Sequence, residues 1–60
     1  MVTVQVQLTE DEALALAQFV KRVGWSEWRA NAIDDAETRL MREAFDRLQA
    51  GLKEAGFAPR

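Results

Sequence analysis

Few side chains in this sequence could perform catalysis. The chain has no His, Cys or Tyr, so possible acids, bases and nucleophiles near neutral pH are carboxylates, lysines and a single serine, Ser26. Ser26 has no candidate base beyond its chance neighbour Glu27, and the glycines are scattered instead of forming a phosphate-binding loop. We therefore predict no catalytic residues, no cofactor and a protein that is not an enzyme.

An Asp-Asp pair is the one sequence feature that suggests a divalent cation. Asp34 and Asp35 are adjacent, but no further acid stands at the ligand spacing of a calcium loop. The absence of His and Cys also argues against zinc. We predict no metal site.

Residues that could bind a partner are concentrated in one short stretch. It holds both tryptophans of the chain, and Trp and Arg are enriched in binding hot spots. Alternatively, the tryptophans close the open end of a helical hairpin, with each indole N–H bonded to a carbonyl. Both interpretations hold if only one indole is buried. The predicted partner-binding set is Trp25, Glu27, Trp28 and Arg29, and a second choice is Arg39, Arg42 and Asp46.

The first element is predicted from a period of two. Apolar side chains alternate with polar ones, which favours a strand over residues 2–8 with one buried side. The sequence shows no second strand, so we expect this one to pair with the same strand of a second copy or with another protein's sheet. The predicted dimer strand comprises Val2, Val4, Val6 and Leu8, with Thr3, Gln5 and Gln7 on the other side.

Two helices follow, each marked by a capping box. Thr9 with Glu12 predicts a helix over 10–23, with Gly24 as the C′ residue that stops it. The same spacing at the Asp34–Glu37 segment predicts a helix over 35–55. We expect this second helix to end at Gly56, with Phe57 folded back on its last turn.

These elements predict a single small domain over 1–60 in the α+β class. The order is a strand, a helix, an aromatic connection over 24–33 with room for one short helical turn, a second helix and a tail over 56–60. Sixty residues bury only about 60% of their unfolded surface, and oligomerisation is a usual remedy. We therefore expect a β-α-α homodimer, joined through the strand or through helix faces.

Charge and hydropathy restrict the kinds of partner. The net charge is −2 and the pI about 4.9, which disfavours general attraction to nucleic acid. No apolar run approaches the roughly 18–20 residues that span a bilayer, and no signal-peptide pattern follows Met1. We expect no membrane partner and a cytoplasmic location.

The first half of the chain resembles a ribbon-helix-helix DNA-binding domain. The shared pattern consists of alternating apolar residues, a helix ending at Gly and a Ser shortly after it, carried here by Val4, Val6, Leu8, Leu16, Val20, Gly24 and Ser26. This resemblance implies a dimeric transcription regulator that reads bases through Thr3, Gln5 and Gln7. Because the strand has no Arg or Lys and the first helical turn is acidic, this interpretation ranks second.

Four segments along the chain carry a second resemblance: Ala15–Gly24, Trp25–Arg29, Asp34–Glu37 and Glu54–Arg60. With these segments and its N-terminal strand pattern, the chain resembles over its whole length short uncharacterised proteins encoded by bacteriophages and prophages. This resemblance implies a phage accessory protein that binds and modulates or inhibits a bacterial host protein, for example a defence-system component. A third possibility is a small structural or assembly protein without a separate binding site.

Overall fold

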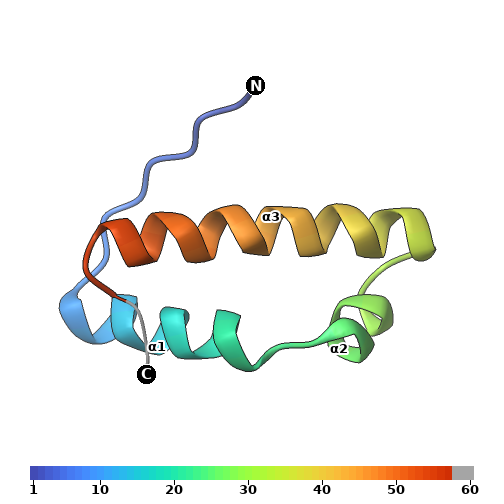
Figure 1. Ribbon diagram of the computed structural model, residues 1–60, viewed down its shortest axis with the longest axis horizontal. Helices are drawn as coiled ribbons and strands as arrows, with labels where there is room; N and C mark the ends of the chain where they lie inside the picture. Colours follow the sequence, from blue (N-terminus) through green and yellow to red (C-terminus); the bar gives the residue numbers. More distant parts are fainter. Residues whose placement is uncertain (58–60) are drawn as a thin grey trace.

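The computed structural model describes residues 1–57 and contains three helices, α1 (Glu10–Arg22), α2 (Trp25–Ala30) and α3 (Asp35–Glu54). Figure 1 shows α1 and α3 side by side and antiparallel, with the short α2 between them in the chain. Helix α2 packs against α3. The last part of the predicted tail, 58–60, lies outside the described residues.

The predicted N-terminal strand is wrong, and so is the α+β class. Residues 1–9 are extended, but no strand occurs among residues 1–57, and the fold there is entirely helical. A strand needs a neighbouring segment that accepts and donates backbone hydrogen bonds, and these residues include no second extended segment that could do so. Val2, Val4, Val6 and Leu8 therefore belong to an extended arm, which we define as residues 1–8.

Side-chain hydrogen bonds cap the N-termini of α1 and α3 at the predicted residues. At α1, the Thr9 N–H donates to Glu12 Oε1 at 2.8 Å and the Glu12 N–H donates to Thr9 Oγ1 at 3.1 Å, which completes the capping box. At α3, the Glu37 N–H donates to Asp34 Oδ1 at 2.8 Å. The Glu37 carboxylate instead accepts from Ile33, at 3.3 Å, so this second box is only half formed.

The end of α1 differs from the prediction. Gly24 has an extended backbone, with φ of −128°, and it is the N-cap of α2 instead of a left-handed C′ residue. Its N–H donates to Glu27 Oε2 at 3.0 Å. The predicted connection therefore contains a six-residue helix, α2, which starts directly after this glycine.

The end of α3 is a Schellman motif. Gly56 has a φ of +98°, a conformation that favours glycine, and its N–H donates to the Lys53 carbonyl at 3.0 Å. The Phe57 N–H donates to the Leu52 carbonyl at 2.7 Å, and Phe57 packs against the core. The predicted role of Gly56 and the fold-back of Phe57 are confirmed.

The core lies between α1 and α3 and is small. Among residues 1–57, four buried residues supply its apolar part, with Leu16, Phe45 and Phe57 packed at its edge; the four are Ala13, Ala17, Val20 and Leu52. Thr38 is completely buried, and its hydroxyl donates to the Asp34 carbonyl at 2.9 Å. Since two of the four core residues are alanines, this packing alone removes little apolar surface from water.

Candidate functional site

Three aromatic rings, one from each helix, join α1, α2 and α3. The ring of Phe45 on α3 stacks on Trp28 of α2, with centroids 5.8 Å apart and an interplanar angle of 28°. Phe19 of α1 meets the same Phe45 ring edge-on, with centroids 6.1 Å apart at 72°. These three residues, called the aromatic cluster below, fix the position of α2 on the helical pair.

The structure separates the two tryptophans of the predicted partner-binding set. Trp28 is half-buried in the aromatic cluster, whereas Trp25 keeps 43% of its surface exposed. The two are three residues apart and so lie on the same side of α2. The indole N–H of Trp28 is buried and has no acceptor among the described residues, in contrast to the expected bond to a carbonyl.

Arg29 of the predicted partner-binding set makes its polar contacts within the chain. Arg29 Nε lies 2.8 Å from Asp35 Oδ1, and its Nη1 donates to the Ala32 carbonyl at 3.2 Å. These contacts tie α2 to the first turn of α3. Because the ion pair is largely exposed, it stabilises the fold by only about 0–1 kcal/mol.

Glu27 has a capping role that also weakens it as a base. Hydrogen bonds from backbone N–H groups, its own and that of Gly24, and then from the Ser26 hydroxyl lower the pKa of the Glu27 carboxyl. The Ser26 hydroxyl donates to Glu27 Oε2 at 3.1 Å on an exposed surface. A carboxylate with a lowered pKa accepts a proton less readily, so this arrangement does not activate Ser26 as a nucleophile.

The Asp-Asp pair takes part in ordinary helix contacts. Asp34 caps α3 through its side chain, and Asp35 pairs with Arg29. Among residues 1–57, no group of three or more His, Cys, Asp or Glu side chains is arranged to hold a metal ion.

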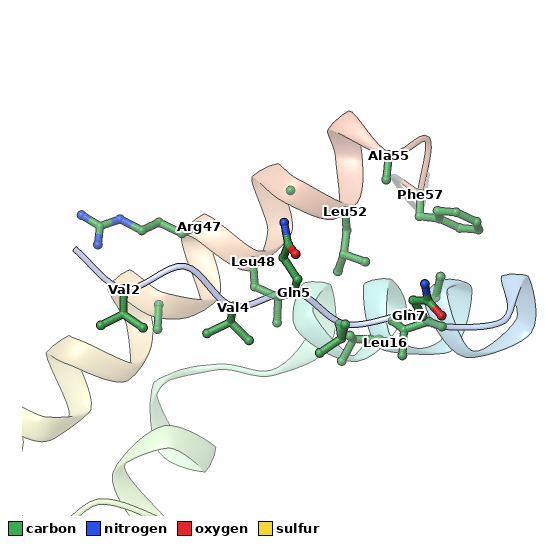
Figure 2. A pocket seen from close by; sticks show the side chains of 15 residues that line it. Val2, Val4, Gln5, Gln7, Leu16, Arg47, Leu48, Leu52, Ala55 and Phe57 are labelled. Carbon is green, nitrogen blue, oxygen red and sulfur yellow. The ribbon is translucent and has the colours of Figure 1, made fainter.

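The second surface of interest is a groove between the arm and the helices, shown in Figure 2. The arm forms one wall, and α1, α3 and the residues just after α3 form the rest. Val2, Val4 and Val6 expose 89%, 79% and 69% of their surface, so they are apolar without being covered. Among the described residues, Arg47 is the one charged residue in the lining, which otherwise consists of Val2, Val4, Gln5, Val6, Gln7, Leu8, Ala13, Leu16, Ala44, Leu48, Gly51, Leu52, Ala55 and Phe57.

The residues of the DNA-binding alternative lie on the arm. Thr3, Gln5 and Gln7 are all exposed, but no paired strand presents them. In Figure 2, Gln5 points to the opposite side of the arm from Val2 and Val4. The second predicted contact set is also exposed, along α3; it consists of Arg39, Arg42 and Asp46.

Sequence reasoning missed the aromatic cluster as a unit and the burial of Thr38. Phe19 and Phe45 fit the apolar side of their own helices, but nothing in a single sequence shows that the Phe45 ring meets both Phe19 and Trp28. The position of Thr38, four residues after the N-cap Asp34, is a signal that was available. A Thr hydroxyl can bond the carbonyl four residues earlier and so be buried without an unpaired group.

The fold and its surfaces define a small helical protein with an exposed apolar arm and a joint of aromatic rings. No helix among residues 1–57 is both long and apolar enough to cross a membrane. The chain belongs to a family of unknown function, DUF7706, whose family model matches residues 1–60. The comparisons with curated proteins and with solved structures found no match.

Proposed function

We propose that this protein is a non-enzymatic binding protein that contacts a partner through the exposed aromatic surface of α1 and α2. The observation that carries the proposal is the exposure of Trp25 (43%) and Phe19 (53%) on helices that Phe45 holds in place. Large aromatic side chains on a rigid support bind with little loss of conformational entropy.

Contacts within the chain reduce the number of residues in the predicted set that are free to bind a partner. Trp28, Glu27 and Arg29 already have structural roles in the aromatic cluster, the α2 cap and the link to Asp35. Trp25 takes part in none of these three contacts, and it keeps 43% of its surface exposed. Of the predicted set, Trp25 is therefore the residue that we propose as the contact anchor.

The nature of the partner comes from the sequence resemblance described above. Resemblance to phage and prophage proteins supports a bacterial host protein as the target, bound in the cytoplasm and modulated or inhibited by the contact. A net charge of −2 supports a protein partner over nucleic acid.

The test compares two exposed hydrophobic residues. Trp25→Ala removes the proposed anchor, and Ile33→Ala, at a residue that is 83% exposed in the α2–α3 connection, is the matched control. Host proteins captured by tagged wild type are quantified for each variant, and direct binding is then measured with the purified partner. We expect Trp25→Ala to raise the Kd at least about 30-fold, equal to 2 kcal/mol, and Ile33→Ala to leave it within about threefold.

Circular dichroism establishes that both variants remain helical before their binding is compared. Capture that does not depend on Trp25, or the absence of any bound host protein, would contradict the proposal. Binding to duplex DNA that is lost on changing Gln5 and Gln7 to Ala would favour the ribbon-helix-helix alternative instead.

A further inference from the structure

The arm exposes apolar side chains to solvent along a stretch whose backbone groups are also unpaired within residues 1–57. Its Val side chains are largely exposed, and among the described residues its backbone N–H and C=O groups make no hydrogen bond with another backbone group. Water satisfies the polar backbone, but it does not favour the alternating valines. The arm therefore has the composition of an interface segment.

The direction of the arm is fixed at its base. The reciprocal hydrogen bonds between Thr9 and Glu12 determine where the chain enters α1. Figure 1 shows the arm running from this point past the C-terminal half of α3 and beyond the helical pair. A fixed entry point limits the positions that the arm can take, which lowers the entropic cost of binding.

The total surface is larger than a folded chain of this size should expose. The accessible area is 5163 Å² for 6.8 kDa, whereas the scaling for monomeric proteins gives roughly 3950 Å². The excess is roughly 1200 Å², and a standard interface buries about 800 Å² on each partner. One interface of ordinary size would therefore cover most of the excess.

The floor of the groove has room for an extended segment. Ala44 and Gly51 of α3 and its C-cap Ala55 are exposed, and a Cβ atom placed on Gly51 would meet no atom within 4 Å. Small side chains allow another backbone to come close to the helix. An apolar segment with no bulky charged side chains fits this floor.

We propose that the groove is occupied by the arm of a second copy of this chain, in a reciprocal, two-fold symmetric homodimer. One chain supplies both an apolar segment and an apolar groove, so a single symmetric contact covers both surfaces on each copy and then closes. Residues 2–8 carry no charged side chain, and Arg47 is the single charged residue among the described residues that line the groove. The arm residues 2–8 therefore bring no charged side chain into the groove of the partner.

The first experiment measures self-association by sedimentation velocity over a range of concentrations. Val4→Asp places a charge in the apolar row, and Thr3→Asp places the same charge one residue away, where the side chain is not part of the groove lining. Wild type and Thr3→Asp should sediment as dimers with dissociation constants within about threefold of each other. Val4→Asp should weaken the dimer at least about 30-fold.

Gly51→Leu separates an effect on the interface from an effect on the fold. The single chain has room for the new side chain, and replacing a helical glycine favours α3. The variant should stay folded while the dimer weakens at least about tenfold, because the side chain fills the groove. A monomeric wild type, or equal association of Val4→Asp and Thr3→Asp, would overturn the proposal.

The second experiment tests whether the arm enters the groove of the partner. The chain has no cysteine, so tagged Val4→Cys and untagged Ala44→Cys chains can be mixed and oxidised without competing thiols. A disulfide between the two different chains is expected. Dimers without this cross-link would place the arm elsewhere and overturn the arrangement, whereas Trp25→Ala should form the dimer normally even if the proposed host contact is wrong.

Discussion

Loss of the Phe45 side chain should destabilise this fold substantially. Its ring contacts Trp28 and Phe19, so it joins α3 to both other helices. Replacing a fully buried Phe by Ala costs about 3–5 kcal/mol, and each aromatic pair contributes about 0.5–1.5 kcal/mol. Because Phe45 is only half-buried, we expect Phe45→Ala to lower the free energy of unfolding by about 2–3 kcal/mol.

That loss is large for a chain of this length. Stabilities of roughly 0.05–0.15 kcal/mol per residue give about 3–9 kcal/mol for 60 residues. Urea unfolding followed by circular dichroism and by tryptophan fluorescence, at one fixed chain concentration, measures the change. Phe45→Leu keeps apolar volume but loses both ring contacts, and we expect it to cost about 1 kcal/mol.

Leu40→Ala is the control on the same helix. Leu40 is 64% exposed, so its truncation should change the free energy of unfolding by no more than about 0.5 kcal/mol. If Phe45→Ala costs no more than Leu40→Ala, the aromatic cluster does not join the helices and our account of the core is wrong.

Two further predictions concern the helix ends. The backbone N–H and then the hydroxyl of Thr9 lower the pKa of the Glu12 carboxyl from its ordinary value of 4.5. The ionised cap therefore stabilises α1 fully above that value, and the contribution declines as the pH falls through the lower pKa of the folded state. Glu12→Gln should reduce this acid dependence of the urea midpoint, and an unchanged pH profile would show that the capping box does not carry it. At the other end of the chain, Gly56→Ala should cost about 1 kcal/mol because of the φ of +98°, whereas Gly51→Ala should stabilise α3 by a similar amount. Equal effects of these two substitutions on the thermal midpoint would contradict the backbone argument.

The sequence best predicted the start of α1 and the end of α3, because their structure depends on residues close together in the chain. Thr9 with Glu12 and the Gly56–Phe57 ending act within one helical turn, so their residue types determine the structure. The start of α2 was missed because Gly24 has two compatible uses, as a helix stop or as an N-cap, and a single sequence does not choose between them.

The errors arose where a prediction needed a distant partner. The alternation of residues 2–8 correctly describes an extended chain with one apolar side, but a strand also requires a paired neighbour. Similarly, residue type marked both tryptophans as anchors, whereas only the packing against Phe45 distinguishes Trp28 from Trp25. Which of the two tryptophans is more buried depends on how α2 packs against α3, and the spacing of residues along the chain does not determine that packing.

The link between Arg29 and Asp35 also determines which parts of the molecule move together. It fastens α2 to the beginning of α3, and the stacked ring of Trp28 adds a second attachment to the same helix. By contrast, the backbone joint between α1 and α2 consists of Val23 and Gly24, both extended. Thermal fluctuations should therefore move α2 together with the first turn of α3, while changes in backbone angle concentrate at Val23 and Gly24.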